Sequence, residues 1–169
     1  MIMFRDMQSF YSGQIFNLDG TLTPSINFPK DIRFIKNFAM LQLGLLKMNK
    51  GAPAYLHYLN LMGKKLGVVS NTSERLIKKY NLRRFNSVKV TGDISSKDPS
   101  KKTNLILETL DDWEMKNNQA IYYGDTLKDA IACHDAKVRF CLVGNPKKKD
   151  LHEIQKISNL HIKSFDEAR

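Results

Sequence analysis

The sequence predicts an α/β fold, a Rossmann-like three-layer sandwich with a mostly parallel sheet and helices on both faces. Three observations support this prediction. Short apolar runs alternate with helical periods from residue 13 onward, an alternation that is typical of βαβ units. These runs are apolar at nearly every position, as expected of strands that helices cover on both faces. The length of 169 residues suits a single domain over 1–169 with a sizeable buried core.

The elements follow one another in a regular order. Strands are expected at 13–18, 65–69, 87–91, 119–123, 138–143 and 160–163. Helices are expected at 52–62, 73–81, 101–113, 127–136 and 150–157. Short polar side chains before several of these helices, such as Ser100 and Thr126, can accept hydrogen bonds from the first helical turn. Gly63 follows the helix at 52–62 in the position of a C-terminal cap.

One segment departs from this alternation. Residues 31–48 are strongly apolar with a helical pattern, and they lie between the first strand and the helix at 52–62. We expect a small helical lid over about 25–50. The same apolar residues would also suit a self-association surface.

Composition limits the classes of partner and location. The formal net charge is +10, which is compatible with a solvated basic surface or with an anionic partner, either a phosphorylated small molecule or nucleic acid. No apolar run approaches the roughly 18 residues that a membrane span needs. The N-terminal residues lack the layout of a signal peptide. Cys133 and Cys141 form neither a disulfide framework nor a metal-ligand spacing, so we expect a cytoplasmic protein without a membrane partner.

Polar residues stand at the carboxyl ends of the predicted strands, the edge where open α/β sheets place their chemistry. The first strand runs into Asn17-Leu18-Asp19-Gly20-Thr21. Positions 17 and 19 share one side because side chains of a strand alternate. Gly20 permits a sharp turn that brings backbone amides towards a phosphate. In isolation, the same segment would also be an ordinary Asp-Gly turn.

Two later strands add to this edge. Ser70 and Asn71 follow the second strand, where they also suit a helix N-cap. Asp125 and Asp129 follow the strand at 119–123, and a pair of carboxylates of this kind suits Mg²⁺. Lys97, Lys101 and Lys102 lie just before the helix at 101–113 or in its first turn. Counting back from the following strand favours Lys101 as the lysine at this edge of the sheet.

In order and spacing, these segments resemble the motifs of the haloacid dehalogenase-like (HAD) phosphohydrolases over residues 13–166. The resemblance implies a Mg²⁺-dependent phosphomonoester hydrolase with a minimal cap. It makes Asp19 the general acid and base, with Ser70 and Lys101 binding the phosphoryl group. It also implies phosphate contacts and a metal site, with Asp129 acting through water or orienting the lysine. The implied phosphate contacts are Gly20, Thr21 and Asn71, and the implied metal residues are Asn17, Asp19, Asp125 and Asp129.

Asn17 departs from this pattern, because the resemblance places a nucleophilic aspartate at its position. An amide cannot form the aspartyl-phosphate of such enzymes, and it is a weaker metal ligand than a carboxylate. Three interpretations are open: an aspartate exchanged to trap substrate, a natural asparagine in a protein that binds phosphorylated compounds without turnover, or slow hydrolysis through Asp19 or water. The predicted function is therefore a HAD-type phosphatase of low or no activity. The alternative is a non-catalytic HAD-fold protein that binds a phosphorylated ligand or nucleic acid.

Overall fold

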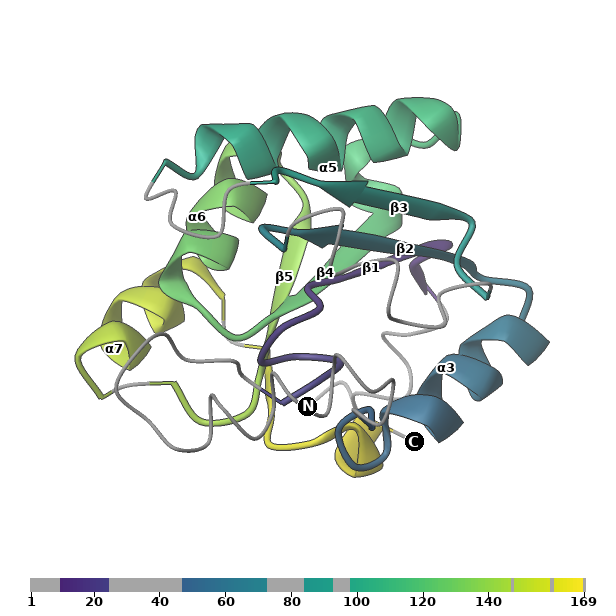
Figure 1. Ribbon diagram of the computed structural model, residues 1–169. Coiled ribbons are helices and arrows are strands. Elements are labelled where there is room, and N and C mark those ends of the chain that lie inside the picture. Colours follow the sequence, from purple (N-terminus) through teal and green to yellow (C-terminus); the bar gives the residue numbers. More distant parts are fainter. Residues whose placement is uncertain are drawn as a thin grey trace.

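A parallel six-stranded sheet forms the centre of the molecule (Figure 1). The computed structural model describes residues 10–24, 47–72, 84–92, 98–146, 148–158 and 160–168. The strands lie in the order β3-β2-β1-β4-β5-β6, and each neighbouring pair is parallel. The predicted α/β fold with a mostly parallel sheet is confirmed. The strands are Gly13–Phe16 (β1), Lys65–Ser70 (β2), Ser87–Val90 (β3), Ala120–Gly124 (β4), Arg139–Val143 (β5) and His161–Ile162 (β6).

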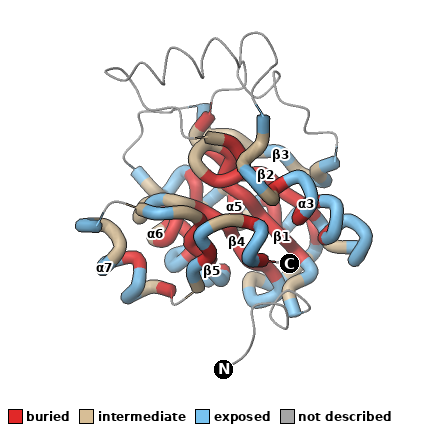
Figure 2. The backbone as a smooth tube through the Cα atoms, turned by 90° about the horizontal axis from the view of Figure 1, so that it is seen from below, coloured by how far each residue is buried: buried red, intermediate tan, exposed pale blue. Residues whose placement is uncertain are grey.

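Helices cover both faces of the sheet. On one face lie α3 (Ala52–Leu61) and the 3₁₀ turn η2 (Phe165–Ala168). On the other face, α6 (Leu127–Asp135) packs between α5 (Ser100–Asp112) and α7 (Lys148–Ile157). A second 3₁₀ turn, η1 (Asn117–Gln119), leads into β4. Each face has its own apolar core, and Figure 2 shows the buried strands enclosed by helices whose outer surfaces are exposed.

The predicted elements correspond closely to these bounds. The helix expected at 101–113 begins one residue earlier, so Ser100 is its first helical residue and not its cap. Pro99 is the N-cap residue and makes no side-chain capping bond. Before it, the Asp98 carboxylate accepts hydrogen bonds from Ser100 N at 2.8 Å and Ser100 Oγ at 2.6 Å. The expected lid over 25–50 and the helix at 73–81 lie largely or wholly outside the described residues. Within the described ranges, no helix has the length and apolar character of a membrane span.

The core on the α3 face contains a buried chain of polar groups among aromatic rings. Phe16 stacks on Tyr123 with ring centroids 4.8 Å apart. Tyr123 donates its hydroxyl to Gln14 Oε1 at 2.9 Å, so the hydroxyl of Tyr55, 2.7 Å away, donates to Tyr123. Gln14 in turn donates to the carbonyl of Tyr11. Each polar group is satisfied, as burial in a core requires, and the chain fixes β1 and β4 against α3.

Candidate active site

The candidate site lies at β1, where the order of the strands in the sheet reverses. β1 stands between β2 and β4 in the sheet order, and in open α/β sheets ligands bind at such a switch point, outside the carboxyl ends of the strands. The parallel pairing of β1 with β4 continues one residue past the end of β1, because Asn17 N donates to Tyr123 O at 2.8 Å. The register therefore sets Asn17 beside Gly124, directly before Asp125.

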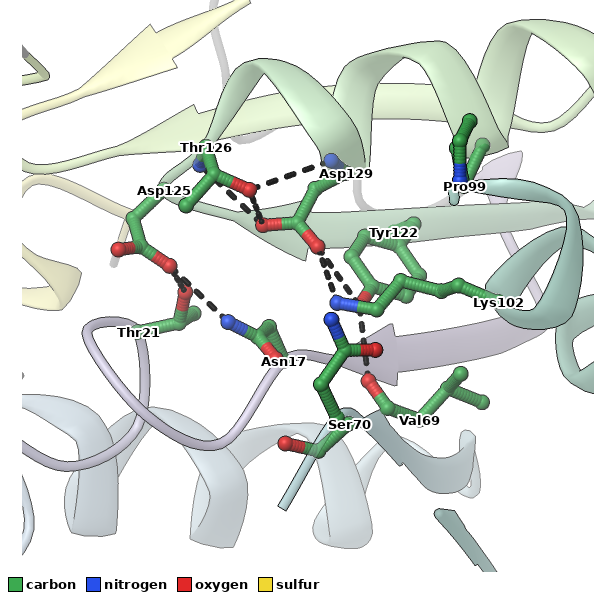
Figure 3. A network of polar contacts seen from close by, with 12 residues as sticks. Asn17, Thr21, Val69, Ser70, Pro99, Lys102, Tyr122, Asp125, Thr126 and Asp129 are labelled. Atoms are coloured by element: carbon green, nitrogen blue, oxygen red, sulfur yellow. Dashed lines mark hydrogen bonds and ion pairs between the residues drawn. The ribbon is translucent and has the colours of Figure 1, made fainter. Parts of the chain in front are cut away.

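Asn17 directs its amide nitrogen towards Asp125 (Figure 3). The Asn17 side chain is 6 % exposed, and its Nδ2 lies 3.0 Å from Asp125 Oδ1 and 2.8 Å from the backbone oxygen of Asp19. Both of these oxygens are hydrogen-bond acceptors, so the Asn17 side chain must direct its amide nitrogen, and not its oxygen, towards them. Thr21 Oγ1 donates to the same Asp125 oxygen at 3.0 Å. Two residues of the β1 turn thus hold the first acid after β4.

Gly20 allows this close approach. Its φ is +84°, a left-handed backbone that glycine adopts without strain. Its N–H donates to Thr23 O at 2.9 Å, which closes the turn. A Cβ at this position would overlap the Asp125 carboxylate. The turn therefore packs its backbone against the acid, and larger side chains are excluded.

Burial and a neighbouring charge change the acidity of Asp125. The pKa of its carboxyl is raised from 3.8 to about 7, first by burial and second by repulsion from the nearby Asp129. The hydrogen bonds from Asn17 and Thr21 and the charge of Lys102 act in the opposite direction. This part of the sheet edge is therefore rich in negative charge, which a bound cation would neutralise.

Asp125→Asn is expected to stabilise the metal-free protein at alkaline pH. The folded-state pKa lies above the unfolded value, so the cost of the charged carboxylate is full above pH 7 and disappears as the pH falls towards 4. The shift corresponds to at most about 4 kcal/mol, and the partial exposure of Asp125 reduces our expectation to about 2 kcal/mol. Chemical denaturation in a chelator at pH 8.5 and pH 4.5 measures this difference. A variant less stable than the parent at pH 8.5 would contradict it.

Asp129 is fully buried and is held by protein groups on both carboxylate oxygens. Oδ1 lies 2.5 Å from Lys102 Nζ and 3.4 Å from the Tyr122 hydroxyl. Oδ2 accepts from Thr126 N at 3.2 Å and from Thr126 Oγ1 at 2.7 Å. Asp129 N donates back to Thr126 Oγ1, which completes a capping box at the start of α6. Asp129 therefore orients the lysine and caps the helix.

Of the candidate lysines in the described residues, Lys102 is the one that reaches the sheet edge. Its side chain is 5 % exposed and points from the first turn of α5 towards Asp129 (Figure 3). Lys101, which the sequence count favoured, is exposed on the same helix. Lys97 lies outside the described residues. The buried lysine differs from the one that the count favoured, because one residue of α5 decides which side chain faces the sheet.

The Thr72 hydroxyl links Asp19 and Ser70 through hydrogen bonds. The sequence analysis assigned Thr72 no role in the chemistry. Its hydroxyl donates to Asp19 Oδ2. Because the hydroxyl proton of Thr72 points to Asp19, the Ser70 hydroxyl is the donor in its 3.0 Å hydrogen bond to Thr72 Oγ1. Ser70 and Thr72 are each 1 % exposed. Asn71 is turned towards β3, where its Oδ1 accepts from Thr91 Oγ1 at 3.4 Å.

Thr72→Val is expected to lower the free energy of unfolding by about 2 kcal/mol, because it removes a buried hydrogen bond to a charged carboxylate. Valine keeps the shape of threonine and loses only the hydroxyl. Thr72→Ser retains the hydroxyl and is the matched control, with a loss of about 1 kcal/mol for the missing methyl group. Urea denaturation of the three proteins measures the difference. Equal losses in the two variants would contradict a role for the hydroxyl.

The comparison with known proteins identifies the family and the fold. Residues 20–143 match the family of haloacid dehalogenase-like hydrolases, which is most of the chain. The chain belongs to this family. Among curated proteins, the sequence search finds no match.

Solved structures of HAD proteins share the fold at low sequence identity. A protein described as a predicted phosphatase from Clostridium acetobutylicum is 18% identical, with a TM-score of 0.70 over 94% of this chain and 96% of that one. CbbY from Rhodobacter sphaeroides, solved with phosphate, is 15% identical, with a TM-score of 0.70 over 92% and 95% of the two chains. A HAD-superfamily hydrolase from Ehrlichia chaffeensis is 20% identical, with a TM-score of 0.66 over 92% and 93%. At these identities the likeness establishes the fold alone.

HAD hydrolases generally use Mg²⁺, and the donor set at the sheet edge fits this ion in part. Mg²⁺ binds in proteins through one or two carboxylates and keeps several waters. Asp19 and Asp125 can supply two, whereas Asp129 is occupied by Lys102 and Thr126. In the described part of the chain, no cluster of three or more acidic, histidine or cysteine side chains suits a metal. Asn17 presents N–H and not oxygen to Asp125, so its amide must turn before it can act as a ligand.

Proposed function

We propose that this chain has the site of a Mg²⁺-dependent phosphomonoester hydrolase in which Asn17 occupies the position of the nucleophile. On this proposal the chain binds phosphorylated compounds and turns them over slowly or not at all. The convergence of the β1, β2 and β4 ends with the first turn of α5 is the observation that carries the proposal. It sets a lysine, two carboxylates and buried hydroxyls together at one edge of the sheet, as phosphoryl transfer requires.

Each residue has a proposed part in binding the phosphoryl group. Lys102, fixed by Asp129, neutralises the charge of the phosphoryl oxygens. Ser70 supplies a hydroxyl, which must turn away from Thr72 Oγ1 to donate to the phosphoryl group. In the β1 turn the N–H of Gly20 is already bound to Thr23 O, so Thr21 is the proposed source of a backbone N–H there. Asp19 and Asp125 hold Mg²⁺, which when bound adds positive charge beside the phosphoryl group. Asp19, held by Thr72, is placed to move a proton at the leaving oxygen.

Asn17 limits the chemistry that these residues can perform. A carboxylate at this position could attack phosphorus and form a phosphoenzyme, whereas a neutral amide cannot. Its N–H also takes up the Asp125 oxygen that a cation would use. This contact favours a second candidate function, a HAD-fold protein that binds phosphorylated ligands without turnover. The comparisons support a phosphorylated small molecule, and nucleic acid has no support among them.

Phosphate release from an aryl phosphate tests the proposal, with the chain and Asn17→Asp compared side by side in Mg²⁺. Turnover by Asn17→Asp alone supports a hydrolase site that lacks only its nucleophile. If neither protein releases phosphate while both bind it, the binding protein is the better description. If neither binds phosphate, both candidate functions fail. The single domain over 1–169 and the cytoplasmic location remain predictions.

A further inference from the structure

A buried tyrosine adjoins the Lys102–Asp129 ion pair, and the proposed function assigns it no role. Tyr122 belongs to β4 and is fully buried in the core on the α5 and α6 side of the sheet. Its hydroxyl lies 2.8 Å from the backbone oxygen of Val69 in β2 and 3.4 Å from Asp129 Oδ1 (Figure 3). Lys102 Nζ contacts the same carboxylate oxygen at 2.5 Å. Asp129 Oδ1 therefore has two hydrogen-bond donors close to it.

The phenol of Tyr122 has one proton for two acceptors. The shorter contact places this proton on the Val69 oxygen while Lys102 holds Asp129. Burial, and next the charge of Asp129, keep the pKa of Tyr122 well above its usual range, so the phenol stays a neutral donor. The ring stacks on Phe140 with centroids 6.5 Å apart. Packing thus holds the ring, whereas the hydroxyl proton can turn about its C–O bond.

Ligand binding changes the demand on Lys102. On the proposed function, its ammonium group serves the phosphoryl oxygens as well as Asp129. A phosphoryl dianion that attracts the ammonium weakens its contact with Asp129, and a fully buried carboxylate is destabilised when a donor is withdrawn. The Tyr122 proton needs only to turn from Val69 O to Asp129 Oδ1 to replace that donor. Because hydrogen bonds to charged acceptors are stronger than those to neutral ones, this turn is then favourable.

We propose that Tyr122 is a positioning residue that donates to Asp129 when Lys102 engages the phosphoryl group. The inference rests on the proposed function, since it requires that Lys102 binds the ligand. Tyr122 acts through Asp129 and has no contact of its own with the ligand. Its hydroxyl lowers the free energy of the bound state more than that of the free state, so a phosphate ester binds more tightly with the hydroxyl than without it.

Calorimetry with ethyl phosphate in Mg²⁺ tests this inference on the parent chain, Tyr122→Phe and Tyr123→Phe. Tyr123 is the matched control, because it is the next residue of β4, is equally buried and donates its hydroxyl to Gln14 in the other core. We expect Tyr122→Phe to bind about fivefold more weakly than the parent, which corresponds to about 1 kcal/mol. Tyr123→Phe should keep the parent affinity. Thermal unfolding shows that each variant is folded before the affinities are compared.

The outcomes separate the inference from the proposed function. If Tyr122→Phe binds ethyl phosphate as tightly as the parent, or if both variants weaken binding equally, the inference is overturned and the proposed function stands. If the parent chain does not bind ethyl phosphate, both are overturned.

Nuclear magnetic resonance follows the phenol proton in the parent chain itself, so this second measurement does not depend on a variant that folds. The chain has six tyrosines, and a ¹³C label on the ring carbon that bears the hydroxyl reports a change of hydrogen-bond acceptor. Saturation with ethyl phosphate should shift the signal of Tyr122, which is assigned by its loss in Tyr122→Phe or by elimination through exchange of the other tyrosines. A merely structural tyrosine would give no shift. An unmoved Tyr122 signal in the saturated protein would overturn the inference.

Discussion

Asn17→Asp is expected to raise the rate of aryl phosphate hydrolysis in Mg²⁺ by at least about 10³-fold, since on the proposed function it supplies the nucleophile that the site lacks. The exchange is nearly isosteric, and position 17 is 6 % exposed beside the end of β4. A carboxylate there would face Asp125 across the 3.0 Å that the amide now bridges. The variant should therefore lose stability in a chelator and regain it with Mg²⁺, which gives a second measurement in thermal unfolding.

Three control variants separate the interpretations of Asn17. Asn17→Ala removes the amide without adding a carboxylate, so it should show no gain in turnover. Asn17→Asp with Asp19→Asn should lose most of the gain, because the acid and base is absent. Asp19→Asn in the parent chain should abolish any residual activity if Asp19 or water performs slow hydrolysis. An Asn17→Asp variant that binds Mg²⁺ and phosphate but releases none would instead favour a binding protein.

The fold and the general position of the site were predictable from sequence because strand and helix patterns have different periods. Every described strand lies within one or two residues of its predicted bounds. Asn17 lies near the end of one predicted strand, Ser70 and Asp125 follow two others, and the carboxyl ends of parallel strands meet at one edge. Local periodicity and the rule for the sheet edge therefore predicted that these residues share one edge of the sheet, whereas their proposed roles came from the resemblance to the HAD motifs.

The contacts within the group were not predictable, because they depend on rotation of helices and on side-chain packing. Lys101 and Lys102 differ by one helical position, and only the docking of α5 turns Lys102 inward. The sequence analysis assigned Thr72 no part in the chemistry, because its approach to Asp19 depends on the three-dimensional course of the turn. Gly13 and Gly67 carry no visible signal either, although Trp113 packs so closely on both that a Cβ would crowd its ring.

Lys102→Met is expected to lower the free energy of unfolding by about 3–5 kcal/mol, because it leaves the Asp129 carboxylate buried without its cation. The two side chains are 5 % and 0 % exposed, and their charged atoms lie 2.5 Å apart. Exchange of both partners, Lys102→Met with Asp129→Asn, should recover much of this loss, since no buried charge then remains. Asparagine at 129 also keeps an acceptor for the capping contacts of Thr126.

The neighbouring lysine provides the control that decides between the two candidates. Lys101→Met changes an exposed side chain on the same helical turn, so its effect on stability should stay within about 0.5 kcal/mol. If Lys102 holds the phosphoryl group, the double variant should refold and still bind ethyl phosphate weakly, whereas Lys101→Met should bind it normally. Loss of binding in Lys101→Met with retention in the double variant would return the role to Lys101. Since the double variant removes the charge without the unpaired acid, this comparison separates the part of Lys102 in binding from its part in folding.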